Sequence, residues 1–177
     1  MPLGRVKHRD RSMLSAMLRG AVAGAVGTVA LDAANYAQYR MAGGTDAPLA
    51  WEFSAGLDSW ESAPAPAKAG KLMFEALFRR ELPATSARTM NNVTHWGYGL
   101  GWGAQYGVIA TSNKSLPLQG PLFGTVVWLS SYVVLPLLRL YQPIWRYDAK
   151  TLAKDWAPHV AYGTATAGAF KMIAHGS

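Results

Sequence analysis

The chain has 177 residues, and 17 Lys and Arg against 10 Asp and Glu give it a net charge of +7. Charged residues make up only 15% of the chain, well below the roughly 25% of an ordinary soluble domain. Because cysteine is absent, disulfides, thiolate catalysis and cysteine-ligated zinc or iron–sulfur centres are excluded. The basic excess suits nucleic acid, anionic lipid or positive loops beside a membrane, and the positions of the charges decide among these.

Long stretches almost free of charge divide the chain, whereas residues 41–89 are rich in charge. A helix needs about 20 apolar residues to cross a hydrocarbon core of about 30 Å, and soluble amphipathic helices carry a charged face along their whole length. The segregation therefore predicts an all-α integral membrane bundle, a single membrane domain over residues 1–177. We expect about four transmembrane helices, at residues 13–36, 92–110, 121–138 and 158–174.

The first predicted span follows a basic tail, and Asp32 is the only charge between Arg19 and Arg40. A signal peptide would share the basic start and the apolar stretch. No small-x-small cleavage site follows before Asp32, so we expect a retained span. Beside a span, the basic tail is explained by contact with anionic lipid, and we expect no nucleic-acid partner.

Residues 41–89 are predicted to form an extramembrane segment in which acids alternate with aromatics. Apolar residues at helical spacing predict an amphipathic helix over residues 67–80, lying on the membrane or against the bundle. Trp51 and Trp60 are candidate interfacial anchors. A small extramembrane cap is the alternative, and the pattern does not separate the two.

Two prolines bear on the third and fourth spans. Pro136 is expected to end or kink the third helix, and Pro158 suits the first turn of the fourth, where a missing N–H costs nothing. The fourth span has a short uncharged core, so an interfacial helix is its alternative. In a four-span hairpin arrangement the connections after the first and third spans share a membrane face, and the charge pattern leaves open which face that is.

Small residues repeat every four positions in the spans and predict close helix packing. The rows are Gly20, Gly24, Thr28 and Asp32 in the first span, and His95, Gly99, Gly103 and Gly107 in the second. We expect these two rows to face each other. Gly120 and Gly124, with Ala161, Ala165 and Ala169, form weaker rows in the third and fourth spans.

Asp32 and His95 fall at the same depth if the first two spans form an antiparallel hairpin. A charge in hydrocarbon costs several kcal/mol at mid-membrane, so we expect the two side chains to pair. The pair could lock the register of the helices, or it could handle protons or ions.

Cofactor binding is a weaker alternative, and we expect no cofactor. Asp155 and His159 begin the fourth span, so Asp32, His95, Asp155 and His159 could together hold a divalent metal. His95 and His159 could also ligate a haem iron from two helices. The glycine string at residues 97–101 lacks a preceding strand and a following lysine, which argues against a phosphate-binding loop. No G-x-S-x-G motif is present.

Two glycine and aromatic patterns carry a resemblance to a known group of proteins. They are Gly20 to Leu31 with Tyr39-Arg-Met-Ala-Gly-Gly44, and Asn91-Asn-Val-Thr-His95-Trp-Gly-Tyr-Gly-Leu-Gly-Trp-Gly103-Ala-Gln-Tyr-Gly107. In these stretches, chiefly the first two spans, the chain resembles the small polytopic bacterial inner-membrane proteins of the YagU-like domain-of-unknown-function group. The resemblance implies a multi-pass protein of the bacterial inner membrane and transfers no catalytic residue.

The hypothesis that follows is a membrane protein without catalytic activity. It would act as a structural or accessory component, with the lipid bilayer and other membrane proteins or further copies of itself as partners. The alternatives are a small proton or ion conductor that uses Asp32 and His95, and a metal- or haem-binding membrane subunit.

Overall fold

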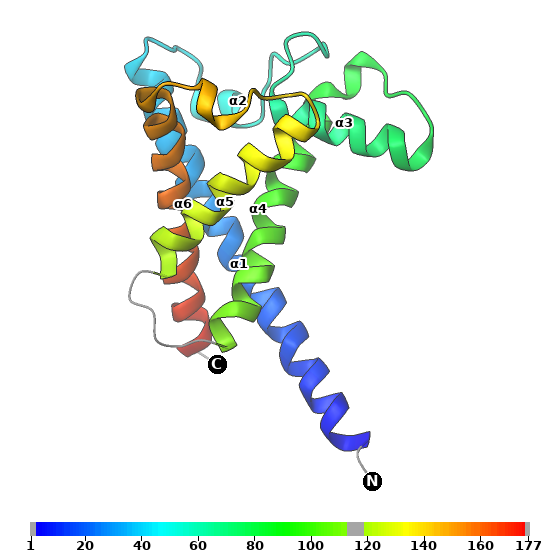
Figure 1. Ribbon diagram of the computed structural model, residues 1–177, viewed down its shortest axis with the longest axis vertical. Helices are drawn as coiled ribbons and strands as arrows, with labels where there is room; N and C mark the ends of the chain where they lie inside the picture. Colours follow the sequence, from blue (N-terminus) through cyan, green and yellow to red (C-terminus); the bar gives the residue numbers. More distant parts are fainter. Residues whose placement is uncertain (1–2, 113–118, 176–177) are drawn as a thin grey trace. The chain divides into compact units, whose positions relative to one another are not determined.

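The computed structural model describes residues 3–112 and 119–175. Over these residues the chain is all-helical and contains no strand, which confirms the all-α part of the predicted fold class. The elements in chain order are α1 (Leu3–Met41), α2 (Pro48–Glu52), α3 (Ala65–Phe78), η1 (Ala84–Ser86), α4 (Ala87–Ser112), α5 (Gln119–Leu137), η2 (Ile144–Arg146) and α6 (Ala149–His175) (Figure 1). The predicted amphipathic helix over residues 67–80 corresponds to α3, and the short helix α2 was not predicted.

Two helices are long and apolar enough to cross a membrane, judged by length and composition over the described residues. They are Met13–Met41, within α1, and Gln119–Leu137, which is α5. They contain most of the first and third predicted spans. The second and fourth predicted spans lie in α4 and α6, which are helical but do not meet the same test. Four spans therefore stay a prediction.

The start of α6 corrects one prediction, because Pro158 lies inside this helix rather than in its first turn. The helix begins earlier because Asp148 caps it: the Asp148 carboxylate accepts hydrogen bonds from the Thr151 backbone N–H at 2.9 Å and from the Thr151 hydroxyl at 2.6 Å. A proline inside a helix leaves the carbonyl four residues earlier without its usual donor. That carbonyl, of Lys154, accepts a hydrogen bond from the Gln38 amide at 3.0 Å instead.

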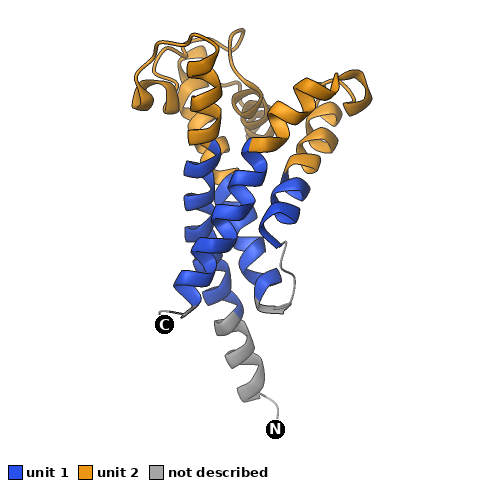
Figure 2. Cartoon of the chain, turned by 90° about the vertical axis from the view of Figure 1, so that its left-hand side faces the viewer, with its two compact units in different colours: residues 1–31, 99–127, 158–177 blue, residues 32–98, 128–157 orange. Residues whose placement is uncertain are grey.

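The chain divides into two compact units (Figure 2), and the single membrane domain over residues 1–177 stays a prediction. Unit 1 comprises Met1–Leu31, Gly99–Val127 and Pro158–Ser177, and unit 2 comprises Asp32–Tyr98 and Trp128–Ala157. Helices α1, α4, α5 and α6 each contribute residues to both units.

In unit 1 the two predicted glycine rows lie in direct backbone contact. A Cβ placed on Gly24 would lie 2.5 Å from the Gly99 oxygen and 2.8 Å from the Gly103 Cα. A Cβ placed on Gly20 would lie equally close to backbone atoms of Gly103 and Gly107. The Thr28 hydroxyl donates to the Gly24 carbonyl at 2.9 Å, so this side chain needs no other polar partner. Only glycine leaves room for α1 and α4 at this separation.

A second close helix contact in unit 1 joins α5 to α6. A Cβ on Gly163 would lie 2.7 Å from the Gly124 Cα, and the Gly163 oxygen lies 3.1 Å from a Cβ placed on Gly120. The sequence predicted the α5 half of this contact. On α6 it pointed to the alanine row and did not include Gly163.

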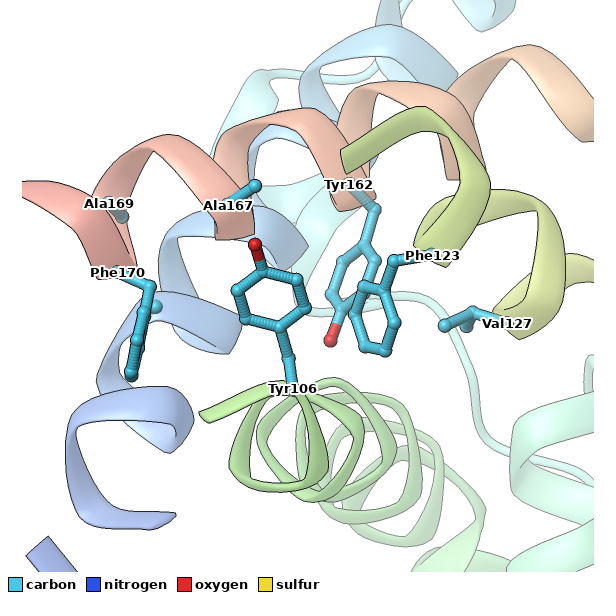
Figure 3. Close-up of a cluster of buried hydrophobic side chains, with 8 residues drawn as sticks. Tyr106, Phe123, Val127, Tyr162, Ala167, Ala169 and Phe170 are labelled. Carbon is cyan, nitrogen blue, oxygen red and sulfur yellow. The ribbon is translucent and has the colours of Figure 1, made fainter. Parts of the chain in front are cut away.

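Aromatic side chains fill the core of unit 1 between α4, α5 and α6 (Figure 3). Tyr106 packs against Phe123 and Phe170, with ring centroids 4.8 Å and 5.7 Å apart. The buried Tyr162 hydroxyl donates to the Gly99 carbonyl at 2.6 Å. The polar end of this tyrosine is therefore satisfied inside the core.

Tyr162→Phe is expected to lower the free energy of unfolding by about 1 kcal/mol, because the Gly99 carbonyl loses a buried hydrogen bond. Thermal unfolding of the purified protein in detergent, followed by circular dichroism, measures the change. Tyr36→Phe is the matched control, because the Tyr36 hydroxyl donates to the Asp46 carbonyl at an exposed position. Equal unfolding midpoints for the two variants would contradict the stabilising role of the Tyr162 hydroxyl.

Candidate functional site

The candidate site lies in unit 2 and begins with Asp32 on α1 and His95 on α4. The His95 Nε2 atom lies 2.9 Å from Oδ1 and 3.0 Å from Oδ2 of Asp32. Asp32 is only 7% exposed, so its carboxylate is largely removed from water. The structure thus brings together the two side chains that the hairpin argument placed at one depth.

Glu52, the last residue of α2, joins this pair. One ligand atom from each of Asp32, Glu52 and His95 lies within 4.8 Å of the other two. Burial raises the pKa of the Glu52 carboxyl, and the negative charge of Asp32 raises this pKa further. Two carboxylates and an imidazole in one place can share a proton or coordinate a metal ion.

The turn after Glu52 is anchored to α4 by three hydrogen bonds. The Phe53 carbonyl accepts from Arg88 Nε at 2.9 Å and from Asn92 Nδ2 at 3.2 Å. Asn91 Nδ2 bonds the Ser54 hydroxyl oxygen at 3.0 Å. Ser54 adopts a φ of 48°, a left-handed conformation that these contacts help to hold. Because Glu52 directly precedes this turn, the three donors set its position beside His95.

Aromatic packing and a tyrosine hydrogen bond anchor α2 to α1. The Trp51 ring lies 5.3 Å from that of Tyr36 and 5.9 Å from that of Tyr39. The Tyr39 hydroxyl donates to the Asp46 carboxylate at 2.6 Å, just before α2. Glu52 therefore belongs to a segment held on both sides, by α1 and by α4.

The structure corrects the predicted metal set of Asp32, His95, Asp155 and His159. Over the described residues, the group of histidine and carboxylate side chains close enough to share an ion contains Asp32, His95 and Glu52. Asp155 instead accepts a hydrogen bond from the Trp128 indole at 3.0 Å. His159 belongs to unit 1, and the haem pairing of His95 with His159 stays a prediction.

Sequence reasoning missed Glu52 because it lies in the segment between two predicted spans, where no periodicity fixes its neighbours. The only signal was the alternation of acids and aromatics around Trp51. Asn91 and Asn92 lie at the start of the second predicted span. Their function as anchors for the Phe53 turn could not be read from spacing.

Comparisons with known proteins place the chain in no family: no family model, no curated protein and no solved structure matches it. The resemblance to the YagU-like group therefore stays a prediction.

Proposed function

We propose that the chain is an integral membrane protein of about four spans that acts as a structural or accessory component. In this proposal it has no catalytic activity and packs against other membrane subunits or further copies of itself. The resemblance of its first two spans to bacterial inner-membrane proteins is in line with that location.

The proposal rests mainly on the distribution of apolar side chains around α1 and α5. On α1, large side chains are exposed at regular intervals, at Leu14, Leu18, Val22, Val26 and Val29. The buried residues of the same stretch are small: Ala16, Gly20, Ala23, Gly24, Gly27 and Thr28. A soluble core helix buries its large apolar side chains, whereas a membrane helix can direct them to lipid and pack through small residues.

Helix α5 follows the same rule. Leu122, Val126, Val133 and Leu137 are exposed by half or more of their surface. Only 28% of the most apolar 18-residue stretch of α5 is buried, and 33% of the corresponding stretch of α1 is buried. A water-facing surface with two such stripes would be prone to aggregation, and a bilayer would cover both.

Single cysteines test the number of spans, because the chain has none of its own. Gly56→Cys and Gln142→Cys place a thiol at two exposed positions, in the connection after α1 and in the connection after α5. With four spans the two thiols lie on one membrane face. With only α1 and α5 spanning, they lie on opposite faces.

We expect a membrane-impermeant maleimide to label both variants from the same side of sealed vesicles. Vesicles permeabilised with detergent, in which the reagent reaches both membrane faces, control for the reactivity of each thiol. Labelling from opposite sides would reduce the fold to two spans, and recovery of the protein in the soluble fraction after carbonate washing would contradict a membrane location altogether.

A further inference from the structure

We propose that Asp32, Glu52 and His95 bind a divalent transition-metal ion. The three side chains come from α1, α2 and α4, and one ligand atom from each lies within 4.8 Å of the others. The three residues are far apart in the sequence and come together only when the chain folds. This inference goes beyond the accessory role proposed above and does not depend on it.

The spacing of the Asp32–His95 pair suits coordination of one ion. In an octahedral site with metal–ligand distances of about 2.1 Å, neighbouring ligand atoms lie about 3 Å apart. The Nε2 atom of His95 lies 2.9 Å and 3.0 Å from the two Asp32 oxygens. These are also the distances of a hydrogen-bonded pair, so an ion would take the place of the hydrogen bond between Asp32 and His95.

The surroundings of the Glu52 carboxyl group also favour a bound cation. Its Oε1 atom is shielded from solvent and makes no well-formed hydrogen bond with the described residues, and the Trp96 side chain lies close to the carboxyl group. A shielded carboxylate oxygen without a donor is costly, and a neighbouring carboxylate on Asp32 adds repulsion. One imidazolium can balance one of the two carboxylates, whereas a divalent ion balances both.

The donor set indicates which ions fit. Imidazole nitrogen suits zinc, iron and other first-row transition metals, and carboxylate oxygen is accepted by zinc and manganese. Magnesium prefers oxygen ligands and keeps most of its waters. A site with one nitrogen and two carboxylates therefore favours Zn²⁺ or Mn²⁺ over Mg²⁺.

The hydrogen bonds around the site support a stable ligand geometry. Arg88 and Asn92 on α4 both donate to the Phe53 carbonyl, directly after Glu52. The same helix carries His95, so Glu52 and His95 are tied to one element. Ligands held by neighbouring hydrogen bonds lose less freedom when an ion binds.

Calorimetric titration tests the proposal with the full chain in detergent, after removal of bound metal with a chelator. We expect ZnCl₂ or MnCl₂ to bind at one ion per chain, and MgCl₂ to bind at least tenfold more weakly. Glu52→Gln is expected to weaken the affinity for Zn²⁺ or Mn²⁺ by at least tenfold. Glu61→Gln, an exposed carboxylate of the same connecting segment, is expected to bind like the unaltered protein.

The helix content of each variant, measured by circular dichroism, checks that the fold is retained. Asp32→Asn serves as a second ligand variant and is expected to lose binding in the same way. The proposal is wrong if the chelator-treated protein binds neither Zn²⁺ nor Mn²⁺, or if Glu52→Gln and Asp32→Asn bind as tightly as Glu61→Gln. Neither result would alter the number of spans found by thiol labelling.

Discussion

Gly103→Ala is expected to lower the free energy of unfolding by about 3 kcal/mol, although it adds a single methyl group. A Cβ at this position would lie 2.5 Å from the Gly24 Cα and 2.7 Å from the Gly24 nitrogen. Both atoms belong to the backbone of α1, so no side-chain rotation can relieve the clash. The two helices have to separate, and their remaining contacts weaken together.

Gly101→Ala is the matched control, because it lies two residues away on α4 and nothing approaches its Cβ position within 4 Å. Alanine favours a helix over glycine by about 0.5–1 kcal/mol, so this variant is expected to unfold at the same temperature as the unaltered protein or slightly above it. Circular dichroism during heating in detergent compares the two. If Gly103→Ala were as stable as Gly101→Ala, the close contact of α1 and α4 would be contradicted.

The contact between Gly24 and Gly103 could be predicted because it depends on helix geometry alone. A repeat of four places small residues along one side of a helix, and small residues mark the side that packs most closely in a membrane protein. Asp32 and His95 extend the same two rows, so an antiparallel arrangement aligns them in depth. The same reasoning failed for α6, where the contact with Gly124 comes from Gly163 rather than from an alanine row.

The place of Glu52 could not be predicted, because it follows from the path of a connecting segment. Helix α2 has five residues, too few for a periodic pattern to reveal. Its position depends on Arg88, Asn91 and Asn92, which donate to Phe53 and Ser54 across more than 30 intervening residues. Side-chain to backbone contacts of this kind leave no regular spacing in the sequence.

The first turn of α6 shows a local signal that was overlooked. Proline is common in the first turn of a helix, and this preference favoured a start near Pro158. Aspartate is a strong residue for capping a helix, and Asp148 with Thr151 three positions later forms such a cap. The cap determined where the helix begins, and the Gln38 amide compensates for the proline inside it.

Removing either member of the Asp32–His95 pair is expected to cost about 3 kcal/mol, because the other is left partly buried without its partner. In Asp32→Asn with His95→Gln the two losses should not add, since each removes the same interaction. A double-mutant cycle is expected to give a coupling of about 2 kcal/mol. Unfolding is measured in the presence of a chelator, so that metal binding does not contribute.

Asp155→Asn combined with His95→Gln is the control cycle, because Asp155 bonds Trp128 and lies outside the Asp32, Glu52 and His95 cluster. Its two effects are expected to add to within about 0.5 kcal/mol.

The same Asp32→Asn variant separates a structural pair from a conducting one. A structural pair predicts loss of stability without any pH-driven proton flux in proteoliposomes of the unaltered protein. If the unaltered protein shows a proton flux, and Asp32→Asn abolishes this flux without changing the unfolding temperature of the protein, the pair is assigned to conduction instead. A residue that carries protons without holding the helices together changes the flux alone.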